Sequence, residues 1–130
     1  MKKQISALLA AAVLSAVSAS EVSCRDYSAI ARNMGFFGVS AYPGEVCEVE
    51  IPESFTPVYE RYNALQKEGG YDLSNYRGKK CVRYTYTIED KNARLNVLVY
   101  NGSVIGGDIC SVTLDGIMIP IKKEAAENAP

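Results

Sequence analysis

Two β-rich runs separated by only Asn101-Gly102 constrain this chain more than any other feature. A two-residue turn of type I′ needs positive φ at both central residues, and Asn-Gly meets that need best. Residues 95–100 and 103–112 on either side carry many valine, leucine and isoleucine side chains. The sequence therefore predicts a tight antiparallel hairpin, with Tyr100 paired to Ser103.

The register of this hairpin assigns each side chain to one face of the sheet. Continuing the pairing from the turn places Asp108 opposite Leu95, on a face that is otherwise apolar. The other members of this predicted core face are Val97, Val99, Val104, Val112 and Ile119. The opposite face is mixed, and it is less polar than a fully solvated face should be. Its members are Arg94, Asn96, Leu98, Tyr100, Ile105 and Ile109.

Hydrophobic periodicity predicts two helices earlier in the chain. The first covers residues 25–34, where apolar side chains recur at helical spacing. The second follows Thr56 as N-cap, has Pro57 at its first position and ends at Gly69-Gly70. Its predicted inner face carries Phe55, Val58, Tyr59, Tyr62 and Leu65. Gln66 falls on the predicted outer face.

Alternation and turn signals predict the strands. Residues 36–41 and 47–51 form an early pair, and a meander of four strands runs from 81 to 121, with a second I′-type turn at Asp115-Gly116. We expect an α+β fold in which two helices pack on one face of a mainly antiparallel sheet. The predicted order of elements is α-β-β-α-β-β-β-β, and residues 122–130 are predicted to be a frayed tail.

The first 19 residues have the pattern of a secretory signal peptide. Lys2 and Lys3 precede an apolar run over 5–17, and small residues follow it, with cleavage expected after Ala19 or one residue later. The run is too short to span a bilayer comfortably, so no membrane span is expected after cleavage. A buried N-terminal helix is one alternative, but it gives Lys2 and Lys3 no role. Lipid attachment at Cys24 is another, disfavoured because Glu21 stands where an aliphatic residue is expected. We expect a secreted or envelope protein with one domain over residues 20–121.

Composition excludes several classes of function. Cleavage removes Lys2 and Lys3 and no acid, which leaves 12 basic against 15 acidic side chains. This mildly acidic balance gives no electrostatic footprint for nucleic acid or anionic lipid. The sequence contains no histidine, so a Ser-His-Asp or Cys-His site is impossible within it. No metal site and no cofactor are expected. The oligomeric state is left open.

Four cysteines lie in the mature chain, and an exported protein with an even count suggests two disulfides. In the meander, Cys81 begins its strand and Cys110 nearly ends its own, too far apart along the strand direction for a bond. This disfavours Cys81–Cys110 and, with it, Cys24–Cys47. Of the other two pairings we favour Cys24–Cys81 with Cys47–Cys110 over Cys24–Cys110 with Cys47–Cys81. Four reduced cysteines are a further alternative.

The motif Gly106-Gly107-Asp108 interrupts the regular alternation of the hairpin. The glycines lie inside a strand, which favours a bulge or a close backbone contact over a phosphate loop. Either the bulge turns Asp108 outward, or Asp108 is buried with a partner such as Arg83 or a tyrosine hydroxyl. A buried, paired carboxylate is a candidate for a functional site.

Many short motifs of the chain resemble a small domain family of Gram-positive bacteria, described as a domain of unknown function, over roughly residues 27–119. The resemblance implies an exported or envelope setting and no activity, substrate or catalytic residue. The chain has Gly35-Phe36 where the family pattern has Gly-Trp. The matching motifs include Ile51-Pro52, Val58-Tyr59, Tyr62-Asn63, Asp72-Leu73, Gly78-Lys79, Arg83-Tyr84-Thr85-Tyr86, Leu98-Val99-Tyr100 and Val104-Ile105-Gly106-Gly107-Asp108-Ile109.

Three functions follow from these observations as hypotheses. The first is an exported non-catalytic binding module whose protein or glycan partner meets the mixed sheet face. The speculative binding residues are Leu98, Tyr100, Ile105, Gly106, Gly107 and Asp108. The second is a peptidase-inhibitor or propeptide-like module, which rests on fold analogy alone. The third is an enzyme that uses Asp108 with acidic or tyrosine partners.

Overall fold

The computed structural model describes residues 26–113 and 116–127. The predicted signal peptide, Cys24 and half of the predicted Asp115-Gly116 turn lie outside these residues.

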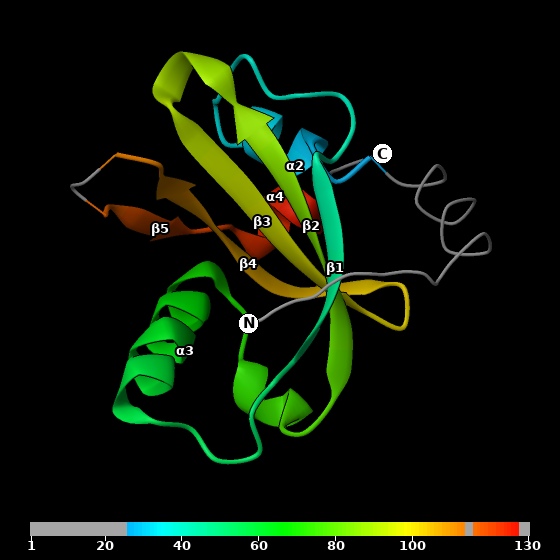
Figure 1. Ribbon diagram of the computed structural model, residues 1–130, viewed down its shortest axis with the longest axis vertical. Coiled ribbons are helices and arrows are strands. Elements are labelled where there is room, and N and C mark those ends of the chain that lie inside the picture. The colour runs from blue at the N-terminus through cyan, green and yellow to red at the C-terminus, as the bar shows by residue number, and fades with distance from the viewer. Residues whose placement is uncertain (1–25, 114–115, 128–130) are drawn as a thin grey trace.

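The fold is α+β and is built on one antiparallel sheet of five strands (Figure 1). The strands lie side by side in chain order. They are β1 (Glu45–Glu50), β2 (Lys80–Ile88), β3 (Ala93–Tyr100), β4 (Ser103–Ser111) and β5 (Met118–Pro120). The predicted antiparallel sheet is therefore confirmed, and β1 joins the C-terminal meander through β2. The predicted strand over 36–41 is wrong, because that segment makes only the isolated bridge of Val39 with Ile88.

Three α-helices accompany the sheet in the described residues: α2 (Ala29–Asn33), α3 (Pro57–Gly69) and α4 (Lys123–Glu127). The 3₁₀ turn η2 (Leu73–Tyr76) lies between α3 and β2 in the chain, and η3 (Glu89–Lys91) lies between β2 and β3. The termini of α3 agree with the prediction. The Thr56 side chain accepts a hydrogen bond from Tyr59 N at 3.2 Å, and Gly70 closes the helix with φ of 102°. The local capping signals thus fix the bounds of α3.

The predicted hairpin turn is also confirmed. Asn101 and Gly102 have φ of 51° and 80°, the positive values that a type I′ turn requires. Tyr100 pairs with Ser103 as predicted, but the register shifts after the next pair. Ile105 is the extra residue of a β-bulge.

The bulge changes the partners of every later residue in β4. Val97 lies opposite Gly107, and Asn96 lies opposite Asp108. The predicted pairing of Asp108 with Leu95 is therefore wrong, and Asp108 lies on the other face of the sheet. At the next strand pair, Cys110 lies opposite Met118.

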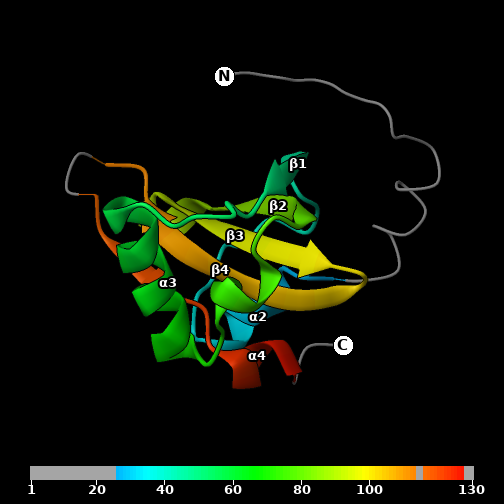
Figure 2. The same ribbon diagram turned by 90° about the horizontal axis from the view of Figure 1, so that it is seen from below.

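Each face of the sheet carries its own hydrophobic cluster. The first cluster lies on the face of Leu95, Val97 and Val99 and includes α2 and α4; Figure 2 shows these two helices together beneath the strands. The second cluster lies on the opposite face and includes residues of α3 and η2. Its buried members are Ile51, Leu73, Cys81, Leu98 and Ile105, with Tyr59, Tyr62 and Tyr76 packed against them.

The predicted arrangement of both helices on one face is thus not found, because α2 and α3 contribute to opposite clusters. Two further residues differ from their predicted faces. Val112 of the predicted core face is half exposed, and Ile109 of the predicted mixed face is buried in the first cluster because the bulge reverses its side. The mixed face is less polar than a solvated face for a physical reason, since α3 and η2 cover part of it.

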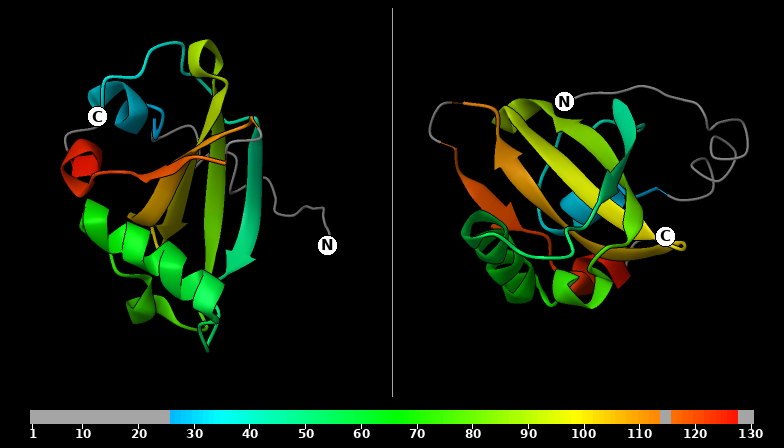
Figure 3. Two further views of the ribbon diagram at one scale, coloured as in Figure 1. Left: turned by 90° about the vertical axis from the view of Figure 1, so that its left-hand side faces the viewer. Right: turned by 60° about the horizontal axis from the view of Figure 1, so that its bottom comes forward.

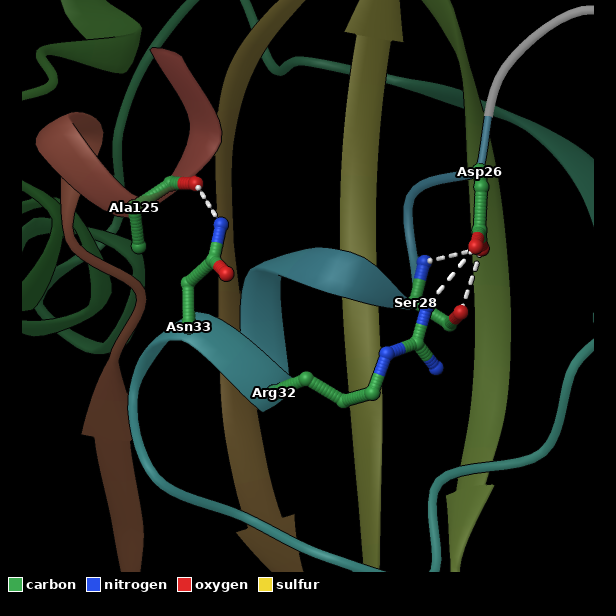
Figure 4. Close-up of polar contacts among 5 residues, drawn as sticks. All are labelled: Asp26, Ser28, Arg32, Asn33 and Ala125. Carbon is green, nitrogen blue, oxygen red and sulfur yellow. Dashed lines mark hydrogen bonds and ion pairs between the residues drawn. The ribbon is translucent and has the colours of Figure 1, made fainter. Parts of the chain in front are cut away.

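Polar contacts hold α2 in place (Figure 4). The Asp26 carboxylate accepts hydrogen bonds from the Arg32 guanidinium at 2.7 Å and from Ser28 N at 3.1 Å. Asn33 Nδ2 donates to the carbonyl oxygen of Ala125 in α4 at 3.0 Å. Ala125 is buried, so Lys123–Glu127 is a packed helix, where the sequence predicted a frayed tail.

Candidate functional site

The Asp108 carboxylate forms the centre of a buried polar network between α3 and the sheet. Only 3% of Asp108 is exposed. The Tyr62 hydroxyl of α3 donates to Oδ2 at 2.6 Å, and Asn96 Nδ2 of β3 donates to Oδ1 at 3.0 Å. Both carboxylate oxygens therefore have a donor. The sequence offered two alternatives for Asp108, outward rotation by a bulge or burial with a partner. A bulge does move Asp108 to the other face, and there it is buried with a tyrosine hydroxyl as its partner.

The network continues across the sheet through Asn96. Thr85 Oγ1 of β2 donates to Asn96 Oδ1 at 2.8 Å, and Asn96 Nδ2 lies 3.6 Å from Cys110 Sγ. These side chains come from three adjacent strands and one helix. Because each bond satisfies a group that α3 and the strands shield from water, the network fixes the position of α3 on the sheet.

Burial sets the ionisation behaviour of this network. Desolvation raises the pKa of the Asp108 carboxyl above its ordinary value, against the hydrogen bonds from Tyr62 and Asn96, which lower it. Burial, together with the neighbouring Asp108 carboxylate, raises the pKa of Tyr62 far above the usual range. Tyr62 therefore keeps its proton and remains a hydrogen-bond donor at neutral pH.

Gly106 allows α3 to approach β4 closely, and Gly107 allows the neighbouring strand β3 to do so. A Cβ on Gly106 would lie 2.7 Å from Gln66 Oε1, and one on Gly107 would lie 2.2 Å from the carbonyl oxygen of Asn96. Gly107 N donates to Gln66 Oε1 at 2.8 Å. The predicted close backbone contact applies to these glycines, whereas the bulge lies one residue earlier, at Ile105.

Gln66 is the residue of this contact that the sequence prediction missed. It was assigned to the outer face of the helix, yet only 1% of it is exposed. Gly106 is the one sequence signal for it. A residue without a side chain leaves room on a strand for a long polar side chain from another element.

The remaining predicted binding residues belong to the second cluster. Leu98 and Ile105 are 5% and 2% exposed, because α3 and η2 cover them. Tyr100 packs against Tyr76 with ring centroids 5.6 Å apart. The predicted partner surface on this sheet face is therefore wrong at its apolar positions, which are core.

The cysteines of the described residues, Cys47, Cys81 and Cys110, are free thiols. Cys47 in β1 and Cys110 in β4 are separated by two intervening strands, about 14 Å at 4.7–4.9 Å per strand. A disulfide spans at most about 7 Å between Cα atoms. The predicted Cys47–Cys110 bond is therefore absent, and Cys24–Cys81 stays a prediction because Cys24 is outside the described residues.

The outer edge of β1 is a second candidate site. Figure 3 shows β1 at the border of the sheet, and no described strand pairs with its outer side. Ile51 N donates to the carbonyl oxygen of Lys79 in the segment before β2, at 2.9 Å. Backbone direction alternates along an antiparallel strand. The N–H and C=O groups of Val46, Glu48 and Glu50 therefore point away from β2.

The side chains of this edge are exposed and mostly acidic. Glu45 pairs weakly with Arg83 at 3.7 Å, and Glu50 lies opposite Lys80 on β2. Glu48 lies opposite Val82, and 44% of Val46 is exposed. Acidic side chains on an edge strand oppose pairing with another acidic strand and leave the backbone groups accessible.

Two further findings concern metal ligands and membrane-spanning helices in the described residues. In 26–113 and 116–127, no group of three Cys, Asp or Glu side chains is placed to hold a metal ion. Within the same ranges, no helix has the length and apolar character needed to cross a bilayer.

Comparison with known proteins gives one family match. Neither the curated proteins nor the solved structures contain a match to this chain. Residues 35–109, more than half of the sequence, match the family model described as a domain of unknown function, DUF4830. This span includes β1, α3 and four residues of the Asp108 network, Tyr62, Thr85, Asn96 and Asp108. The predicted resemblance to a domain of unknown function is thereby confirmed, and the chain belongs to the DUF4830 family.

Proposed function

We propose that this protein is an exported, non-catalytic binding module that recognises an extended segment of another protein through the outer edge of β1. The signal-peptide pattern of residues 1–19 supports export. The observation that carries the binding role is the row of outward-directed backbone groups on Val46, Glu48 and Glu50. This row runs over about 13 Å at 3.3 Å per residue.

Strand addition suits such an edge. An extended peptide that lies beside β1 pairs its own backbone with these N–H and C=O groups, and its alternate side chains meet the two faces of the sheet. A glycan offers no repeating backbone of donors and acceptors with this spacing. We therefore favour a protein partner over a glycan partner.

The geometry of Asp108 argues against the enzyme hypothesis. A catalytic carboxyl has to reach the proton or atom that it acts on. Asp108 is buried, and each of its oxygens accepts a hydrogen bond from a neighbouring side chain. The network therefore serves to hold α3 against β3 and β4. No contact of the described residues favours the inhibitor or propeptide alternative.

The substitution Val46→Pro tests the binding site. Proline removes one outward N–H and is tolerated on edge strands, so the fold is expected to survive. Val46→Thr is the matched control, because it keeps the N–H and the β-branched shape. Peptides selected from a random displayed library against the wild-type protein should bind Val46→Thr equally and lose at least tenfold in affinity for Val46→Pro. Selected peptides that bind Val46→Pro as tightly as the wild type would refute the site.

Export is tested separately by expressing the full chain in a bacterial host and determining the N-terminus of the protein recovered outside the cytoplasm. The expected first residue is Ser20, or Glu21 if cleavage occurs one residue later. Intact chain that keeps Met1 and stays in the cytoplasm would contradict export without bearing on the β1 edge.

A further inference from the structure

The two faces of β1 differ in chemistry, and this difference bears on which extended segment fits beside it. The inference rests on the proposed function. Val46, Glu48 and Glu50 direct their side chains to the face of the first cluster, and all three are exposed. Cys47 and Val49 lie on the opposite face and are partly buried. An added strand would present alternate side chains to these two environments.

On the first of these faces, Glu48 is the carboxylate best placed for a partner. Its cross-strand neighbour is Val82, an apolar side chain, whereas Glu50 lies opposite Lys80. A residue directly opposite on an added strand has its Cβ about 4.5–5.5 Å away. A lysine or arginine at that position gives an opposite-charge pair, and an acid there gives a repulsive one.

On the second face, Val49 borders the second cluster together with Phe55 and Tyr59. Phe55 and Tyr59 are half-buried, and their ring centroids are 4.7 Å apart. An apolar side chain on the added strand would extend this cluster over Val49. Burial of apolar surface stabilises the complex by roughly 25 cal/mol per Å².

A second copy of this chain fits the edge poorly. Antiparallel pairing of β1 with another β1, centred on Glu48, would place the two Glu48 carboxylates directly opposite each other, with both Glu50 carboxylates on the same face. Like charges across a strand pair are destabilising, and charged edge strands are a common means of preventing self-association. The acidic edge thus favours a basic partner over a homodimer.

We propose that the β1 edge binds an extended segment in which basic and apolar residues alternate. The basic side chains face Glu48 and Glu50, and the apolar side chains cover Val49. The recognised chemistry is therefore a β-strand of Lys/Arg and aliphatic residues in strict alternation, paired to the backbone of β1.

Three synthetic seven-residue peptides test this proposal. The first alternates lysine with valine, the second alternates glutamate with valine, and the third repeats the first with methylated backbone nitrogens. Fluorescence anisotropy measures affinity, and amide hydrogen exchange reports protection at Val46, Glu48 and Glu50. We expect the lysine peptide to bind at least tenfold more tightly than either of the others and to protect the three outward amides.

Charge reversal in the protein gives the complementary test. Glu48→Lys should weaken binding of the lysine peptide at least tenfold and improve binding of the glutamate peptide. Glu68→Lys on α3 makes the same change in net charge on another exposed element, and it should alter affinity by less than twofold. Equal effects of the two variants would overturn the assignment of Glu48.

The outcomes separate the partner chemistry from the proposed function. If the lysine and glutamate peptides bind equally and both protect the outward amides, the preference for basic residues is wrong and the edge remains the binding site. If neither peptide protects these amides, both proposals fail. If the methylated peptide binds as tightly as the first, attraction is purely electrostatic and strand addition is refuted.

Discussion

Replacing Tyr62 with phenylalanine removes one hydroxyl and leaves the rest of the Asp108 network in place. The lost bond is short, at 2.6 Å, and its acceptor is a carboxylate that is 3% exposed. Asn96 still donates to Oδ1, and Oδ2 loses its tyrosine donor. The change is nearly isosteric, so packing against the second cluster is preserved.

The expected cost follows from the charge of the acceptor. A hydrogen bond to a charged group contributes about 1.5–3 kcal/mol, and a neutral one about 0.5–1.5 kcal/mol. The bond from Tyr62 belongs to the stronger class once Asp108 has lost its proton, and we expect Tyr62→Phe to lower the free energy of unfolding by about 2 kcal/mol at pH 7. For a domain of this size this corresponds to a fall in melting temperature of several degrees.

The cost depends on pH in a defined direction. Burial raises the folded-state pKa of Asp108 above its value in the unfolded chain, so its contribution favours folding at low pH and is lost as the pH rises through the folded pKa. The Tyr62 hydrogen bond lowers that pKa. Removing the bond therefore raises the pKa further, and the variant should lose more stability relative to wild type at pH 7 than at about pH 4.

Urea unfolding of wild type and Tyr62→Phe at both pH values measures these free energies. Asp108→Asn provides the control, because it removes the titrating group at this position. In that background the loss of the Tyr62 hydroxyl should cost less and should vary little with pH. A cost below about 0.5 kcal/mol at pH 7, or an equal cost at both pH values in the wild-type background, would refute this account of the network.

Three further predictions concern other parts of the fold. Gly107→Ala should lower the free energy of unfolding by about 3 kcal/mol or more, because its Cβ would meet a backbone oxygen at 2.2 Å. Gly44→Ala has open space around its Cβ, so in the same thermal unfolding assay it should be neutral or raise the free energy of unfolding by up to about 1 kcal/mol. Thr56→Ala should lower the free energy of unfolding by about 1 kcal/mol through loss of the α3 cap, and Thr56→Ser should largely retain it, as urea unfolding will show. Burial raises the pKa of the Cys81 thiol to about 11, so iodoacetamide at pH 8 should modify Cys81 at least tenfold more slowly than Cys47. Peptide mass spectrometry follows both reactions, and equal rates would contradict the burial of Cys81.

Several elements are predictable because their signals are local. The Asn101-Gly102 turn and the caps of α3 each depend on a few neighbouring residues whose backbone preferences are strong. The hairpin partners nearest the turn follow from the same chemistry. Asp108 and the two glycines before it were also recognisable as irregular, since alternation in a strand is a local property.

The faces of the sheet were not predictable in the same way. One extra residue at Ile105 reverses the side of every later residue in β4, so a register drawn from the turn places Asp108 and Ile109 on the wrong faces. Gln66 was misplaced for a related reason. A glutamine on a helix is usually solvated, and its burial depends on a strand that follows it by some forty residues.

The sequence by itself determined the turn, the bounds of α3 and the interruption of the strand alternation at Gly106-Gly107-Asp108, because backbone preferences act between near neighbours. Only the tertiary structure decided that helices cover both faces, that Tyr62 and Asn96 pair with Asp108, and that β1 stands at the edge with its backbone groups directed outward. These features arise when segments far apart in the chain pack together, bury apolar surface and satisfy each other's polar groups. They therefore depend on the fold of the whole chain and not on neighbouring residues.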